Sequence, residues 1–494
     1  MIEGKNYYNS ENYSLNGSNK YKGSYYELDS SIFKGNLLKN PSFENGLEFW
    51  TSNNARTSND TPAEGTQVAI LASGVASISQ DVPINKDNPY PLLLSLILYN
   101  GEVGTPIIGL GNLVVQILWL DKQYNVIASG LRGFISSRAL NNNGRTTYYD
   151  ITDTPPPEAA YARFLLSKGD GSVAINLMAI DNIILTPVKT ANLLQNPSFE
   201  NGLTGWTANG FNTGFSVMLE GAAAAESNGE GSLSQDIPLN NFLRRSPFLL
   251  SFAVISNLTS SLNVRLLWLD SNNNQIGLPG LDFTIQPATL SLQANLLSYL
   301  DISNSAPIEA VKVRVLFSTT ASTTPGRLII DHVLLAAVIT DNLIENYSFE
   351  TGLSLNNWSV INTLPFVTDR AYSGNVAAII SQEGGVLYQD VSLPSSSENS
   401  YLLNFGLLYF GGRFPNGDLI AKVSWLNEEN KEIGLGLSII VPLFIFQLNA
   451  WLVYSGITET APRSATKARI QFTKSSGGTG GSIAVDRVVF ARLI

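Results

Sequence analysis

Hydrophobic and polar residues alternate along much of the chain, and short clusters of turn residues separate the alternating stretches. Residues 159–165, 310–316 and 465–472 show the pattern most plainly, with Lys, Arg or Tyr set between apolar residues. A period of two is typical of antiparallel β-strands that bury one face. The 41 glycines and 22 prolines, many of them in turn clusters, also favour many short strands over long helices. The pattern therefore predicts an all-β protein.

The same order of strands and turns occurs three times. The opening segment Asn36 to Trp50 recurs from Asn192 to Trp206, and a third copy begins at Asn342. The copies start roughly 150 residues apart, which is the size of a domain and not of a solenoid repeat. About eight strands in that length indicate a jelly-roll β-sandwich. We predict three tandem jelly-roll β-sandwich modules behind an extended N-terminal arm, with boundaries 1–35 (arm), 36–188, 189–338 and 339–494.

The links between the predicted modules are short. Residues 186–191 and 337–341 have neither the length nor the Gly/Ser content of flexible tethers. We therefore expect neighbouring modules to touch and to hold a defined angle.

The N-terminal arm, residues 1–35, has a different composition. It is rich in Asn, Ser, Tyr and Gly and holds too little apolar material to fold alone. Two interpretations stay open: a disordered tail, or an arm that docks on another subunit by adding a strand to an exposed edge. Its candidate self-assembly residues are Tyr7, Tyr8, Tyr13, Tyr21, Tyr25 and Tyr26.

The charged residues bear on assembly and on partners. They make up only 14% of the chain, against roughly 25% in ordinary soluble proteins. A sparsely charged surface is poorly protected against self-association, so we expect part of it to be covered in an assembly. The net charge of −10 argues against a nucleic-acid partner, which would need a basic stripe.

The composition leaves little material for catalysis. There is no Cys, and the equivalents of the only histidine, His332, are Asn182 and Arg487 in the other copies. Nucleophilic chemistry of the Ser–His or Cys–His kind therefore has almost no residues to use, and we predict that the protein is not an enzyme. The chain shows no secretory signal and no apolar run of about 20 residues, so we expect synthesis in the cytoplasm and no membrane span.

The tryptophans repeat with the modules. Six of the seven occupy shared positions, which predicts core packing in preference to sugar platforms: Trp50, Trp206, Trp358, Trp119, Trp268 and Trp425. Only Trp451 stands outside the pattern. On the strand of Trp119 the opposite face is apolar too, at Leu118 and Leu120, and Leu267 and Leu269 repeat this. We expect a loop, the next module or another subunit to cover that second face.

Two motifs in each copy carry a resemblance. They are the opening Asn-x-x-x-Asn-x-Ser-Phe-Glu-x-Gly-Leu and a closing apolar-Asp-x-apolar-x-apolar strand. The copies resemble the jelly-roll carbohydrate-binding modules associated with xylanases, and equally the domains that precede collagen-like repeats in spore-surface proteins of Firmicutes. This chain departs from both, since it has no Gly-X-Y tract and no catalytic domain.

The resemblance implies a structural calcium ion. In the carbohydrate-binding families the Glu of Phe-Glu and the late Asp help to hold one, and two carboxylates with loop carbonyls are donors that calcium accepts. The alternative is that each Glu caps a turn and each Asp bonds the backbone at the end of its strand. The positions concerned are Glu44 with Asp181, Glu200 with Asp331, and Glu350 with Asp486.

Sparse charge, rigid repeated modules, a Tyr-rich arm and the lack of a signal lead to a functional prediction. We predict a non-enzymatic structural protein that assembles head-to-tail with copies of itself into a fibre or surface layer, on a bacterial spore or cell surface. The alternative is a carbohydrate-binding protein that recognises a polysaccharide through its jelly-roll modules.

Overall fold

The computed structural model describes residues 34–494 apart from short gaps. The gaps are 61, 101–111, 136–143, 171–176, 292, 294, 354, 362–363, 368–370, 382, 395–397, 411–417, 443–449 and 476–480. The six tyrosines predicted to act in the arm lie outside the described residues. Among the residues described, no helix is long and apolar enough to cross a membrane.

Module 1 is a β-sandwich of two five-stranded antiparallel sheets. Their strand orders are β1-β4-β9-β6-β7 and β2-β3-β10-β5-β8. The strands are β1 (Thr51–Asn53), β2 (Ala55–Ser58), β3 (Val68–Leu71), β4 (Ala76–Pro83), β5 (Leu92–Asn100), β6 (Leu113–Leu120), β7 (Val126–Ile135), β8 (Thr146–Ile151), β9 (Tyr161–Lys168) and β10 (Met178–Pro187).

Module 2 has the same layers, but one long strand belongs to both. Strand β12 pairs with β17 through its second half and with β18 through its first half, which joins the two layers into one sheet. Its elements are β11 (Thr207–Gly214), β12 (Ala224–Pro238), β13 (Phe248–Ser256), β14 (Leu262–Leu269), β15 (Leu281–Ile285), the short helix α1 (Pro287–Ser291), β16 (Leu297–Ile302), β17 (Lys312–Thr319) and β18 (Leu328–Ala337).

Module 3 repeats the arrangement of module 1. Its sheets are β19-β22-β27-β24-β25 and β20-β21-β28-β23-β26. After the short 3-10 helix η3 (Thr351–Leu353), its strands are β19 (Ser359–Ile361), β20 (Leu364–Val367), β21 (Val376–Ile380), β22 (Val386–Ser392), β23 (Leu402–Phe410), β24 (Leu419–Leu426), β25 (Glu432–Val441), β26 (Trp451–Ile457), β27 (Lys467–Lys474) and β28 (Ser482–Ala491). The predicted all-β fold class is thus confirmed.

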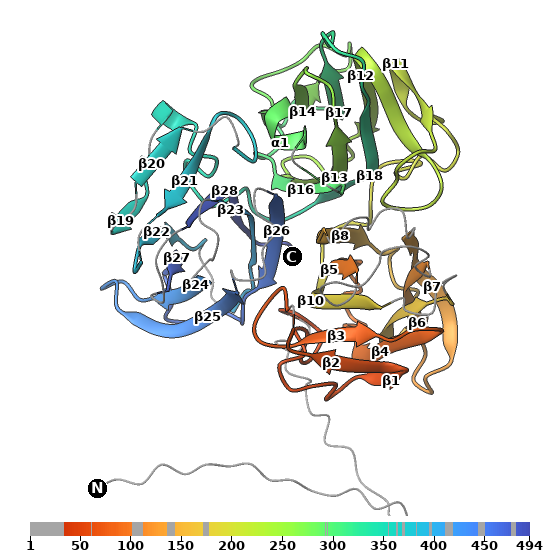
Figure 1. The fold of residues 1–494 in the computed structure, drawn as a ribbon, viewed down its shortest axis with the longest axis vertical. Coiled ribbons are helices and arrows are strands. Elements are labelled where there is room, and N and C mark those ends of the chain that lie inside the picture. The colour runs from red at the N-terminus through yellow and green to blue at the C-terminus, as the bar shows by residue number, and fades with distance from the viewer. Residues whose placement is uncertain are drawn as a thin grey trace, which may run out of the picture.

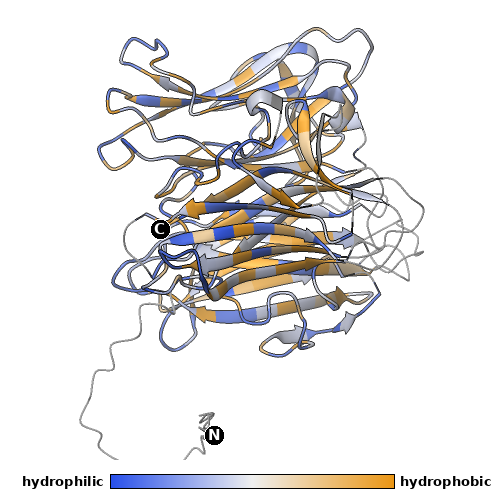
Figure 2. Cartoon of the chain, turned by 90° about the vertical axis from the view of Figure 1, so that its left-hand side faces the viewer, coloured by the Kyte–Doolittle hydropathy of each residue, from blue (hydrophilic) through white to orange (hydrophobic). Residues whose placement is uncertain are grey.

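The alternating stretches became strands with one buried face. Strands β9, β17 and β27 each bury every second residue, and hydrophobic and hydrophilic residues alternate along the stacked strands (Figure 2). The six shared tryptophans are at most 8% exposed, which confirms their assignment to the core, and Trp451 is buried as well. Glycines on the neighbouring strand, or directly before it at Gly280, leave space for the mid-module Trp ring, since a Cβ at Gly130, Gly280 or Gly436 would clash with that ring.

The three modules form a closed ring. Figure 1 shows them around a central axis, with β8, β16 and β26 innermost and in mutual contact. Each module also places an edge strand against a glycine of the next module, through a hydrogen bond between a backbone N–H and a carbonyl oxygen. These bonds run from Gly221 to Phe134 (2.7 Å), from Gly374 to Thr284 (2.7 Å) and from Gly65 to Ile440 (2.8 Å). The contacts thus pass from module 1 to 2, from 2 to 3, and from 3 back to 1.

The innermost strands give the ring a shared core. Every residue of β8, β16 and β26 is buried, and one hydrophobic cluster includes Ile151, Ile302 and Ile457 from the three modules. Contacts of this kind hold domains in one relative position. Neighbouring modules therefore touch, as expected. The second apolar face of the Trp strand is buried at Leu120, Leu267 and Leu269 but only half-buried at Leu118.

Candidate functional site

The repeated Glu and Asp hold one loop from two sides in every module. In module 1, Glu44 accepts hydrogen bonds from the backbone N–H groups of Thr66 and Gln67, both at 2.8 Å. Asp181 accepts from those of Ala63 at 2.7 Å and Glu64 at 3.0 Å. The other modules repeat these bonds: Glu200 accepts from the N–H groups of Ala222 and Ala223, Asp331 from Leu219 and Glu220, Glu350 from Asn375 and Val376, and Asp486 from Ser373.

The aspartates of these pairs are fully buried. Burial raises the pKa of Asp331 to about 7 and holds the pKa values of Asp181 and Asp486 well above their ordinary range. The oxygens of these aspartates accept hydrogen bonds from backbone N–H groups. In this arrangement the aspartates do not present free oxygens to a cation. Among the described residues, no group of three or more His, Cys, Asp or Glu could hold a metal ion. The geometry of these pairs gives no support to the calcium ion that the resemblance implies, and calcium binding has yet to be tested.

Chelation tests the role of calcium directly. We expect the thermal unfolding midpoint to be the same in excess calcium chloride and in excess EDTA, because the carboxylates are already satisfied by backbone donors. A bound ion at a hundredfold excess over its Kd would add about 2.7 kcal/mol of stability. A midpoint that rises with calcium and loses that rise in Glu44→Gln would instead assign the ion to module 1.

The residue after each buried aspartate lies at a contact between modules, which we call a seam. His332 is buried at the seam of modules 1 and 2, where its Nε2 lies 2.7 Å from the carbonyl oxygen of Tyr149 and 3.6 Å from Asp150 Oδ2. Because a carbonyl oxygen only accepts, this Nε2 carries the hydrogen. The His332 ring also stacks on Tyr148, with centroids 5.0 Å apart.

The two other seams use different chemistry at the same place. Arg487 forms an ion pair with Asp301 of module 2, and its guanidinium lies 3.6 Å from the centroid of the Phe283 ring. At the seam of modules 3 and 1 the equivalents are Asn182 and Gly456, without charge. Asn182, His332 and Arg487 therefore occupy equivalent positions in the three modules but differ in charge and in hydrogen-bonding groups. Sequence reasoning missed this structural role of His332.

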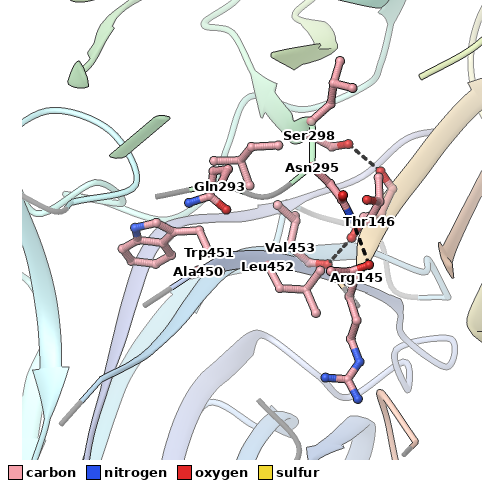
Figure 3. A pocket seen from close by; sticks show the side chains of 13 residues that line it. Arg145, Thr146, Gln293, Asn295, Ser298, Ala450, Trp451, Leu452 and Val453 are labelled. Atoms are coloured by element: carbon pink, nitrogen blue, oxygen red, sulfur yellow. Dashed lines mark hydrogen bonds between the residues drawn. The ribbon is translucent and has the colours of Figure 1, made fainter. Parts of the chain in front are cut away.

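A small cavity lies where the three innermost strands begin. Residues of all three modules line it, including Arg145, Asn295 and Trp451 (Figure 3), and its volume is about 30 Å³. Thr147 Oγ1 donates to the carbonyl oxygen of Val453 at 2.7 Å, and Asn295 Nδ2 donates to that of Gly144 at 2.9 Å. A space of this size holds one or two waters, so we regard it as a joint between modules and not as a ligand pocket.

The outer sheets carry a repeated ion pair. These are the sheets of β1 and β19 and, in module 2, the layer formed by β15, β14, β17 and the second half of β12, on the side of each module away from the axis (Figure 1). On each of them an Arg makes two parallel bonds to an Asp on the neighbouring strand: Arg163 to Asp81, Arg314 to Asp236 and Arg469 to Asp390. About a third of each Arg side chain is exposed. Solvent and ligands can therefore reach these pairs.

Beside the pair of module 2 the surface is hollowed. The hollow has a volume of about 400 Å³, within the range of roughly 300–1,000 Å³ that is usual for ligand pockets. It is lined by Leu193, Gln195, Gly205, Thr207, Ser234, Gln235, Asp236, Ile237, Pro238 and Arg314. Six of these ten residues, Gln195, Thr207, Ser234, Gln235, Asp236 and Arg314, carry side chains that can form hydrogen bonds, so the hollow suits a polar ligand. It is our candidate functional site.

Comparison with known proteins adds no argument about function. No protein-family model and no curated protein matches the sequence. Among solved structures, the tandem CBM22-1–CBM22-2 domain of Paenibacillus barcinonensis Xyn10C is 13% identical over 62% of this chain and 98% of its own, with a TM-score of 0.25. A family 61 carbohydrate-binding module in complex with β-1,4-galactotriose is 19% identical over 31% of this chain and 99% of its own, with a TM-score of 0.23.

A further match is with the enzymatically active domain of tailspike protein 4 from bacteriophage CBA120. It is 20% identical over 32% of this chain, with a TM-score of 0.26, and this chain spans only 22% of its length. Carbohydrate-binding modules thus recur among the structural neighbours. Identities and TM-scores this low carry no information about what this chain binds.

Proposed function

We propose that this chain is a non-enzymatic carbohydrate-binding protein whose three modules act as one rigid ring. The observation that carries the proposal is the open outer sheet of every module, with a partly exposed Arg–Asp pair. The guanidinium and carboxylate supply both donors and acceptors at fixed positions, as recognition of a hydroxyl-rich ligand requires. The ring orients the three sheets away from one another, so a large saccharide surface can be contacted from several sides.

The groups that could carry out chemistry are engaged elsewhere. His332 bonds the backbone at a seam, and the six repeated carboxylates that include Glu44 and Asp181 bond backbone N–H groups. The repeated aspartates of the outer strands, such as Asp81, face arginines, and the partly exposed Asp121 and Asp270 bond the N–H groups of their own turns. A glycosidase needs two carboxyl groups that face each other across the scissile bond, and the repeated acids do not form such a pair. This supports binding without catalysis.

The fibre or surface layer that we predicted first would need a contact other than the one between modules. A head-to-tail contact grows into a filament only when its rotation does not close, and here it closes within one chain. Assembly on a spore or cell surface therefore stays a prediction. It would depend on the arm or on the outer faces.

Binding to glycans is the decisive measurement. We expect the intact chain to bind some members of a glycan array or insoluble polysaccharides saturably, and to leave them uncleaved. Negative-stain electron microscopy of the same concentrated sample should show single rings. Fibres or sheets together with an array that shows no binding would reverse the proposal in favour of assembly.

A further inference from the structure

Two residues that line or face the hollow of module 2 differ from their counterparts in the other modules. Gly205 stands just before the opening tryptophan, where module 1 has Phe49 and module 3 has Asn357. All three positions have positive φ, at 86°, 69° and 71°. Gln195 faces this position in module 2, and its counterparts are Lys39 and Glu345.

In the two other modules the same place is filled. In module 1 the Phe49 ring occupies it, with Lys39 Nζ 5.3 Å from the ring centroid. In module 3, Asn357 is hydrogen-bonded to Glu345. Gly205 has no side chain to do this, and a Cβ added there would come no closer than 3.4 Å to Gln195. The position in module 2 is therefore open. A side chain there would meet no clash, at the cost of the backbone strain of a positive φ that Phe49 and Asn357 also carry.

The floor of the hollow matches module 1 and differs from module 3. Strand pairing puts Ser234 at the position of Ser79 in module 1 and of Tyr388 in module 3. The Tyr388 ring lies under Arg469, with its centroid 4.5 Å from the guanidinium carbon. Only module 2 combines a small residue on the floor with a glycine at the rim. Arg314 lines this hollow, and about a third of its side chain is exposed, as in the two other modules.

We propose that this hollow binds one or two neutral sugar residues, an inference that rests on the proposed carbohydrate-binding function. Ser234, Thr207 and Gln195 provide hydroxyl and amide groups, while Arg314 and Asp236 cancel each other's charge. A neutral site bonds sugar hydroxyls without favouring a uronic acid. The lining contains no aromatic ring, so recognition is by hydrogen bonds within a pocket and not by stacking on a flat polysaccharide.

Filling the hollow with the residues of the sister modules tests the inference. Gly205→Phe copies module 1 and Ser234→Tyr copies module 3, so each variant places a side chain that the fold already accommodates elsewhere. We expect each to weaken binding of neutral disaccharides (cellobiose, xylobiose and galactobiose) by roughly tenfold or more, because two or more hydrogen-bonding groups are covered. Titration calorimetry measures the affinity, and thermal unfolding checks that each variant is folded.

Asn357→Phe is the matched control. It puts the same ring at the equivalent place in module 3, where no hollow is lost, and should leave disaccharide affinity unchanged. If the wild type binds glycans but Gly205→Phe and Ser234→Tyr bind as well as it does, the site is wrong while the proposed function stands. Stronger binding of digalacturonic acid than of the neutral probes would overturn the sugar class. A wild type that binds no glycan on the array overturns both.

Discussion

Replacement of Arg487 by methionine is expected to lower the free energy of unfolding by about 3–5 kcal/mol, because it leaves a buried carboxylate without its counter-charge. Arg487 and Asp301 are each 2% exposed at the seam of modules 2 and 3. Arg487 also donates to Ser373 Oγ at 2.7 Å and packs on Phe283. Methionine keeps most of the apolar packing of the Arg487 side chain, so the decrease in the free energy of unfolding measures the effect of removing its charge.

Equilibrium denaturation in guanidinium chloride measures this loss. The matched control is Arg163→Met in the outer pair with Asp81, whose side chains are 33% and 25% exposed. Pairs exposed to this degree contribute about 0–1 kcal/mol, so the control should be nearly neutral. A second variant, Arg487→Asn with Asp301→Gly, copies the uncharged seam of Asn182 and Gly456 and should recover part of the loss. Equal costs for Arg487→Met and Arg163→Met would contradict the assigned role of the seam.

The repeat and the strands could be predicted from the sequence because their causes are local. Alternation at 159–165 follows from one buried face, and the step from Trp50 to Trp206 and Trp358 identifies the shared core. Alternation and repetition can be recognised in the sequence without knowing which residues pack against the other face of a strand. The same is true of the tryptophans, whose apolar neighbours already place them inside.

The ring could not be predicted in this way. Its closing contact joins Gly65 to Ile440, which are far apart in the sequence, through backbone atoms that carry no side-chain signal. The residue at the seam position also differs in every module, being Asn182, His332 or Arg487. An alignment of the three copies therefore does not mark this position as a contact. Residues 92–99, apolar at nearly every position, gave one usable clue, because a strand buried on both faces needs a partner beyond its own sandwich.

The candidate site could be predicted from the sequence only in part. Asp81 and Arg163 belong to repeated segments, but that they pair depends on strand register. The hollow lies at a position where the copies differ, with Phe49 in module 1 and Gly205 in module 2. A comparison that looks only for residues shared by the copies does not detect such a position. Comparing the opening segments for what changes would have singled out Gly205.

The last expectation is that the protein is more stable in weak acid than in weak base. Burial raises the pKa of Asp331 from 3.8 to about 7, so the folded state binds this proton more tightly than the unfolded state does. The stability that results is fully present below the unfolded pKa and is lost as the pH rises through the folded one. Burial shifts the pKa values of Asp150, Asp181, Asp301, Asp486 and Glu64 in the same direction.

For Asp331 alone the free energy of unfolding should fall by about 3 kcal/mol between pH 5 and pH 8, at 1.36 kcal/mol for each pKa unit. Urea denaturation at several pH values measures the slope. Asp331→Asn still offers an oxygen to the N–H groups of Leu219 and Glu220, but its NH2 group cannot accept from the His332 N–H, which lies 2.8 Å from Asp331 Oδ1. It should therefore reduce the slope and lower stability by about 1–3 kcal/mol at pH 5. Asp81→Asn, at an exposed pair, should keep the wild-type slope. A slope that Asp331→Asn does not alter would show that the folded protein holds this carboxylate ionised, with the backbone N–H bonds compensating for its burial.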